Sequence, residues 1–237
     1  MSDLESIDQH IRQSQPEYLD LLKNLLRIPS VSADPAQRDA MSTASRAVLD
    51  SLQKAGLNAE LIETKGPPLV YAEIPPVPGK PVVLVYGHYD VQPPDPLDLW
   101  VTPPFDPTER DGNLFARGAT DDKGQMLTHI NSVAAWAATG QPLPVQVKFL
   151  IEGEEEVGSE QLSRYLATQE AAKKLACDVI VISDSSQYAP GQPAITYGLR
   201  GIAYFELHVT GPNQDLHSGS FGGAVNNPAN ALARLIA

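Results

Sequence analysis

Residues 82–90 read VVLVYGHYD, five apolar or aromatic residues followed by a glycine, a histidine, a tyrosine and an aspartate. An uninterrupted apolar run of this length, rich in β-branched residues, predicts a strand that is buried on both faces. His88 and Asp90 follow that strand directly. Because ligands of open α/β sheets bind at the carboxyl ends of the strands, we expect these two side chains to belong to a functional site.

On either side of this run, predicted helices alternate with short strands. Helical spacing of apolar residues covers 2–26, 36–55, 123–139 and 159–176. Strands are predicted at 59–63, 69–74, 82–86, 145–151 and 179–183, of which 82–86 and 179–183 are fully apolar, and a loop rich in Pro and Asp is predicted at 93–111. This alternation predicts an α/β fold with a mixed, mainly parallel sheet and helices on both faces.

The pattern changes after Asp184. Residues 195–199 and 202–210 predict an antiparallel pair of strands, and 228–237 predicts an amphipathic helix. We therefore expect a first domain over residues 1–189 and a second over 190–237. One hairpin and one helix are too few to close a core, so the second domain is expected to be incomplete and the chain to be the N-terminal part of a longer protein.

The composition excludes several classes of protein. Seventeen Lys and Arg against 29 Asp and Glu give a net charge of −12, which repels nucleic acid and anionic membranes. The single cysteine, Cys177, excludes a disulfide framework and a Cys-rich zinc module. Neither a signal peptide nor a membrane span is predicted, so we expect a soluble cytoplasmic protein.

Acidic residues follow the other predicted strands in the same way. Glu152–Glu156 follow the strand at 145–151, Asp184 follows the strand at 179–183, and Asp121 precedes a helix. About five carboxylates in one cleft would repel one another and take up protons unless cations neutralised them. Histidine and carboxylate ligands suit zinc, manganese or cobalt, and two bridged divalent ions can activate water against an amide.

Simpler interpretations apply to each signal alone. A run of glutamates is usually a solvated surface, and a single His-x-Asp is weak. His10, His129 and His208 are interpreted as ordinary surface or half-buried residues. The coincidence of acidic groups at three strand ends is what favours a site.

Five motifs occur in order along the chain: YGHYDVQP (86–93), RGATDDKGQ (117–125), EGEEEVGSE (152–160), ISDSS (182–186) and LRG…DLHSGSFGG (199–201, 215–223). They resemble the di-zinc metallopeptidase family of carnosinase-like dipeptidases, aminoacylases, acetylornithine deacetylase and succinyl-diaminopimelate desuccinylase, and most of all its dipeptidase branch. The resemblance implies a zinc-exopeptidase-like catalytic domain followed by a smaller α+β lid domain.

The resemblance also implies a role for each metal ligand. By position, His88 and Asp184 bind a first metal ion, Glu156 binds a second, and Asp121 bridges the two. Asp90 orients the His88 ring and raises its basicity, as carboxylates paired with metal-bound histidines do. The implied cofactors are two divalent ions, with zinc expected and manganese or cobalt as alternatives.

The remaining catalytic roles follow from the same resemblance. Glu155 is the general base, which takes a proton from a metal-bound water and delivers it to the leaving amine. Glu154 falls outside this working pair. His217 stabilises the oxyanion from the lid side, commonly in the site of a partner subunit. A cis peptide bond between Asp121 and Asp122 is expected as well.

The expected function is metal-dependent hydrolysis of dipeptides or short peptides beside a free carboxylate, by a homodimer. Two alternatives stay open: a deacylase of N-acyl amino acids from the same family, and an inactive fragment that acts only in binding or dimerisation. The family's second metal takes a further histidine from a segment near the C-terminus. Since that segment is missing, we expect this chain alone to bind about one ion tightly and to hydrolyse dipeptides poorly or not at all.

Overall fold

The structure, a computed structural model, describes residues 3–237 and forms two compact units, one ending at Ala194 and the other beginning at Ile195. The expected division into domains at 1–189 and 190–237 stays a prediction. The role of the second domain as a lid stays a prediction as well. No helix among the described residues is both long enough and apolar enough to cross a membrane.

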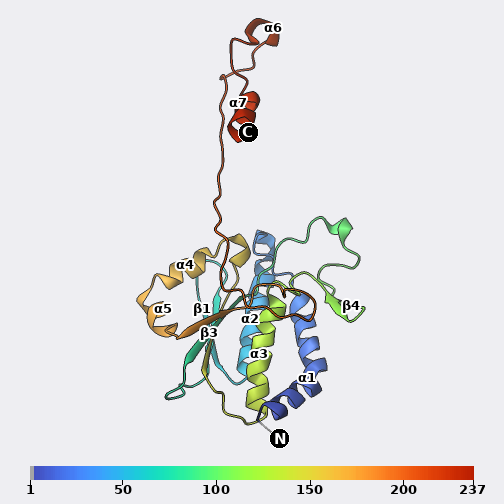
Figure 1. The fold of residues 1–237 in the computed structure, drawn as a ribbon, viewed down its shortest axis with the longest axis vertical. Helices are drawn as coiled ribbons and strands as arrows, with labels where there is room; N and C mark the ends of the chain where they lie inside the picture. The colour runs from blue at the N-terminus through green and yellow to red at the C-terminus, as the bar shows by residue number, and fades with distance from the viewer. Residues whose placement is uncertain (1–2) are drawn as a thin grey trace. The chain divides into compact units, whose positions relative to one another are not determined.

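A five-stranded sheet forms the centre of the first unit, in the order β1-β2-β6-β3-β7 (Figure 1). Its strands are β1 (Asn58–Ile62), β2 (Leu69–Glu73), β3 (Val82–His88), β6 (Gln146–Glu152) and β7 (Val179–Ile182). β3 pairs in parallel with β6 and β7, whereas β2 pairs antiparallel with both β1 and β6. Only β2 therefore runs against the others, and the predicted mixed, mainly parallel sheet is confirmed.

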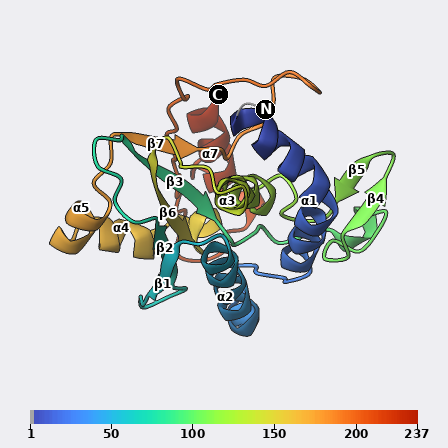
Figure 2. The same ribbon diagram turned by 90° about the horizontal axis from the view of Figure 1, so that it is seen from below.

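Helices cover both faces of this sheet, as predicted (Figure 2). One face carries α2 (Arg38–Lys54) and α3 (Lys123–Ala138), with α1 (Asp3–Leu26) packed against α3. The other carries α4 (Glu160–Leu166) and α5 (Gln169–Lys174). Adjacent residues of β6 serve opposite faces: Phe149 belongs to the core under α2 and α3, and Leu150 to the core under α4 and α5.

β7 differs from the buried strand that its sequence predicts. Val179, Ile180 and Ile182 are 51%, 57% and 61% exposed, because β7 is the edge strand and only β3 pairs with it. A continuous apolar run predicts a strand, but it does not determine the strand's place in the sheet.

Two local predictions also need correction. The single helix expected over 159–176 is broken into α4 and α5, because the Thr168 side chain accepts a hydrogen bond from Ala171 N and caps a new helix. Within and just beyond the loop expected over 93–111, a short 3-10 helix (Leu97–Leu99) forms, and β4 (Thr108–Arg110) pairs with β5 (Asn113–Phe115). Asp111 and Gly112 both have positive φ there, the two-residue turn that an Asp-Gly pair favours.

The second unit contains two helices, α6 (Ser218–Phe221) and α7 (Pro228–Ile236), and α7 confirms the predicted helix. The antiparallel pair expected at 195–199 and 202–210 is absent from the described residues, so the expected α+β character is not found. Its alternating side chains are exposed, Tyr197 by 100% and Tyr204 by 92%. A lone hairpin with nothing packed on it is marginal in water, which explains the error.

Candidate metal centre

The candidate site residues of the first unit lie at the carboxyl edge of its sheet. β3 ends at His88, which pairs in register with Glu152, the last residue of β6. Asp184 follows the last paired residue of β7 by two positions, and Asp121 lies two residues before α3 begins. The peptide bond between Asp121 and Asp122 is cis, which confirms that expectation.

His88 is fully buried and has a different partner on each ring nitrogen. Its Nδ1 lies 3.2 Å from Asp90 Oδ1 and 3.1 Å from the Asp90 carbonyl oxygen. Its Nε2 lies 3.1 Å from Asp121 Oδ1 and 3.7 Å from Asp184 Oδ2. Because both partners of Nδ1 are acceptors, Nδ1 carries a hydrogen, and Nε2 is the nitrogen that faces the two other carboxylates.

Glu155 joins this group. One ligand atom each from His88, Glu155 and Asp184 lies within 4.8 Å of the others. Glu155 and Glu156 sit in a single 3-10 turn after β6, and Asp90 fixes that turn. Asp90 Oδ1 accepts from Glu155 N at 3.3 Å, and Oδ2 accepts from Glu156 N at 3.1 Å. The Asp90 carboxylate therefore connects the His88 ring to the glutamate turn.

Burial and nearby charges raise the pKa values of several residues of the cluster. Burial raises the pKa of Glu155, Glu156 and Asp184, and neighbouring carboxylates add to each shift. Burial alone would lower the pKa of His88, but the hydrogen bond and charge of Asp90, with Asp122 and Glu155, raise it to about 10. The cluster thus holds excess negative charge that protons or cations must neutralise.

Two residues that support the site, Asp122 and Gln92, were not predicted as site residues from the sequence. Asp122 is 1% exposed, its Oδ2 accepts from His88 N at 3.2 Å, and burial raises its pKa to about 7. Gly87 makes room for it, since a Cβ there would lie 2.7 Å from Asp122 Oδ2. Gln92 Nε2 donates to Glu156 Oε2 at 2.6 Å. Both residues lie in motifs quoted above: Asp122 is the second aspartate of DDKG, and Gln92 is the glutamine of YGHYDVQP.

Glu154 lies outside this cluster, and His217 belongs to the second unit. Glu154 Oε2 accepts from Gln161 N at the start of α4, so this side chain caps a helix. His217 belongs to the second unit, where its Nδ1 accepts from Gly219 N at 3.1 Å. His217 thus makes this hydrogen bond within the second unit.

The donor set fits a divalent cation. When the His88 ring is neutral, Asp90 keeps its hydrogen on Nδ1, and the Nε2 lone pair faces the oxygens of Asp121 and Asp184. In the metal-free cluster a proton on Nε2 relieves the repulsion among these three acceptors, in line with the raised pKa of His88, and a divalent cation would take the place of that proton. One imidazole with carboxylates is a ligand set typical of zinc or manganese.

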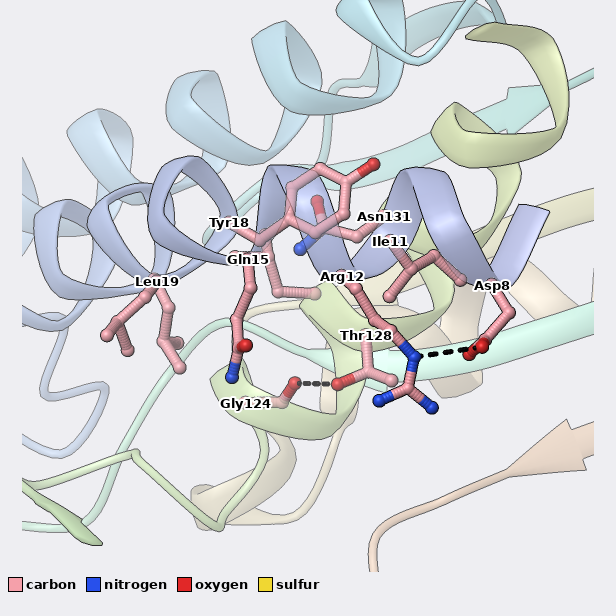
Figure 3. Close-up of a pocket in the computed structure, with 11 residues that line it drawn as sticks. Asp8, Ile11, Arg12, Gln15, Tyr18, Leu19, Gly124, Thr128 and Asn131 are labelled. Atoms are coloured by element: carbon pink, nitrogen blue, oxygen red, sulfur yellow. Dashed lines mark hydrogen bonds and ion pairs between the residues drawn. The ribbon is translucent and has the colours of Figure 1, made fainter. Parts of the chain in front are cut away.

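A groove between α1 and α3 has a volume of about 480 Å³ and is shown in Figure 3. Its lining includes Ile11, Tyr18 and Leu127, with the ion pair of Arg12 and Asp8 at 2.9 Å. None of the carboxylates of the cluster lines it. The groove is therefore separate from the candidate metal centre.

Comparisons with known proteins find relatives in sequence and in structure. Beta-Ala-His dipeptidase of Homo sapiens is 39% identical over 98% of this chain and 48% of its own length. Cys-Gly metallodipeptidase dug1 of Schizosaccharomyces pombe is 37% identical over 98% of this chain and 51% of its own length. The crystal structure of human carnosine dipeptidase 1 superposes with a TM-score of 0.84 at 39% identity, covering 100% of this chain and 52% of that one.

This chain thus spans about half the length of the relatives that it matches. The expected likeness to carnosinase-like dipeptidases is confirmed, and so is the α/β fold that it implied. A family model matches residues 84–228, which include every residue of the candidate site. The chain therefore belongs to Peptidase family M20/M25/M40.

Proposed function

We propose that this chain carries the metal centre of a metal-dependent dipeptidase. The observation that supports this proposal most is the meeting of His88, Glu155 and Asp184, with ligand atoms within 4.8 Å of one another, at the carboxyl edge of an M20-type sheet. Relatives that are dipeptidases by name at 37–39% identity add to it. None of the relatives reported above favours a deacylase or a binding fragment.

Two divalent ions, with zinc expected, would occupy this centre. His88 and Asp184 would hold the first ion, Glu156 the second, and Asp121 both. Manganese and cobalt suit the same ligands and are the alternatives. The second ion would be held more weakly by this chain, because only two of these residues face it.

Bound ions would supply a Lewis acid for the substrate carbonyl and would lower the pKa of the attacking water. Glu155 would accept a proton as that water adds to the carbonyl carbon, and would return it to the nitrogen as the carbon–nitrogen bond breaks. Burial raises the pKa of Glu155, which suits a group that must both take and give a proton near neutral pH. Asp90 would hold the Glu155 backbone in place throughout.

His217 would donate a hydrogen bond to the oxyanion of the tetrahedral intermediate. Its Nδ1 accepts from Gly219 N, so in the neutral ring the hydrogen lies on Nε2 and can be donated. We propose that it acts within a homodimer formed through the second unit of the whole protein. The substrate class would be dipeptides, and a cytoplasmic location stays a prediction.

The proposed base can be tested by comparing neighbouring glutamates. Glu155→Gln should abolish whatever dipeptide turnover the chain shows with zinc or manganese, while leaving tight zinc binding in place. Glu154→Gln is the matched control and should keep wild-type turnover, because Glu154 caps α4 instead of facing the cluster. β-Ala-His and Cys-Gly are suitable substrates. Equal turnover by wild type and Glu155→Gln, at a rate above that of the metal-free chain, would remove Glu155 from its role.

A further inference from the structure

Asp184 is supported by the sheet less than His88, the other strand-end residue of the candidate metal centre. β7 pairs only with β3, and the last paired residue is Ile182. The side of β7 away from β3 has no partner strand among the described residues, and Ile182 is 61% exposed. Strand pairing and apolar packing thus fix Asp184 less firmly than they fix His88, which is buried at the end of a central strand.

A side-chain hydrogen bond holds the residue just before Asp184. His129 Nε2, on α3, lies 2.6 Å from Ser183 Oγ, immediately before Asp184. Among the hydrogen bonds of residues 3–237, it is the one that joins α3 to the end of β7. Burial lowers the pKa of His129, so its ring is neutral at pH 7 and can pair with a hydroxyl.

His129 lies on α3, a helix whose position is fixed by its packing on the sheet. The helix begins at Lys123, directly after Asp121 and Asp122, and its buried side packs on β3. His129 lies seven residues after Asp122, two turns or about 10 Å along the helix axis. Asp121 therefore lies just before the start of a rigid helix, and His129, the partner of Ser183, lies about two turns further along the same helix.

We propose that His129 is a positioning residue that acts through Ser183 to hold Asp184 at the spacing from Asp121 and His88 that a divalent cation requires. The inference rests on the metal centre of the proposed function. It goes beyond that function by giving a role to a histidine outside the five motifs. His129 itself touches neither ion nor substrate.

The test measures zinc affinity of the 237-residue chain by competition with a chromophoric chelator. His129→Phe keeps an aromatic ring but removes Nε2, and Ser183→Ala removes the hydroxyl. Each should weaken the tight zinc site about tenfold, at the low end of the effect of removing a partner of a metal ligand. The double variant should lose no more than either single one, because both remove the same contact.

Conservative variants separate positioning from general stability. Ser183→Thr keeps the hydroxyl, and His129→Gln brings an amide to the place of Nε2, so both should bind zinc within about threefold of wild type. Ser186→Ala, at an exposed position three residues further on, is the matched control. Unfolding with excess chelator measures the metal-free stability of each variant. If His129→Phe does not fold, Ser183→Ala and Ser183→Thr still decide the result.

The inference is wrong if His129→Phe and Ser183→Ala bind zinc like wild type while Asp184→Asn does not. It is also wrong if they lower metal-free stability and leave zinc affinity unchanged, because that result describes a purely structural contact. If wild type itself binds no zinc, the proposed metal centre fails and the inference fails with it. The Asp184→Asn variant thus distinguishes failure of the inference from failure of the proposed function.

Discussion

β3 and β7 have nearly the same sequence character but different surroundings. Leu84 of β3 and Ile180 of β7 are paired neighbours, yet Leu84 is 5% exposed and Ile180 is 57% exposed. Each strand leads to a candidate metal ligand. His88 is held by the core, by Asp90 and by Asp122. Asp184 has an exposed strand behind it, a hydrogen bond at the preceding residue Ser183, and His88 Nε2 at 3.7 Å from its Oδ2. The two ends of the site should therefore respond differently to substitution.

The largest effect is expected at the β3 end. Asp90→Ala removes the buried partner of His88 and the acceptor of two backbone N–H groups, so it should lower the metal-free free energy of unfolding by about 3–5 kcal/mol. Urea denaturation measures this change. Asp90→Asn keeps one acceptor oxygen and should lose less. An Asp90→Ala variant as stable as wild type would show that this carboxylate does not organise the β3 end.

The paired residues Leu84 and Ile180 give a direct comparison of the two strands. Leu84→Ala creates a cavity in the core under α4 and α5 and should cost about 2–5 kcal/mol. Ile180→Ala on the exposed strand should cost about 0.5 kcal/mol, as surface substitutions do. If urea denaturation showed equal losses of stability for Leu84→Ala and Ile180→Ala, β7 would be buried in solution, and the two strands would not differ in burial.

Gly87→Ala should have a smaller effect, again at the β3 end. The new Cβ would lie 2.7 Å from Asp122 Oδ2 and 3.2 Å from Met126 Cβ, so the cost in stability should be about 1–3 kcal/mol. Gly198→Ala is the matched control, because nothing lies within 4 Å of its added Cβ. Thermal unfolding compares the two. A neutral Gly87→Ala would show that Asp122 does not pack closely behind His88.

Sequence patterns predicted the elements that local spacing and burial determine. The apolar run at Val82–Tyr86 gave a strand that lies inside the sheet, and the periodicity of 123–139 gave α3 to within one residue. The same reasoning placed β7 correctly along the chain but did not predict that it lies at the edge of the sheet. A strand's position in the sheet depends on which other strands pair with it, and its own sequence does not show this. The strands expected at 195–199 and 202–210 failed because strand-like alternation needs a surface to pack on.

The candidate site divides in the same way. His88, Asp121 and Asp184 could be predicted as neighbours because parallel strands end at one edge. The resemblance added separate roles for Glu155 and Glu156, which stay predictions. Asp122, Gln92 and His129 were not predicted, because each acts through a contact between segments distant in sequence. His129 pairs with a residue 54 positions away, which no local pattern reveals.

Zinc binding to the 237-residue chain, measured by titration calorimetry with wild type and His88→Ala, tests the central claim most directly. The account predicts about one tightly bound ion per wild-type chain and loss of that binding in His88→Ala. Zinc at 100 times the dissociation constant should also stabilise wild type by about 2.7 kcal/mol. A wild-type chain that binds no zinc, or a His88→Ala variant that binds it equally well, would contradict the account.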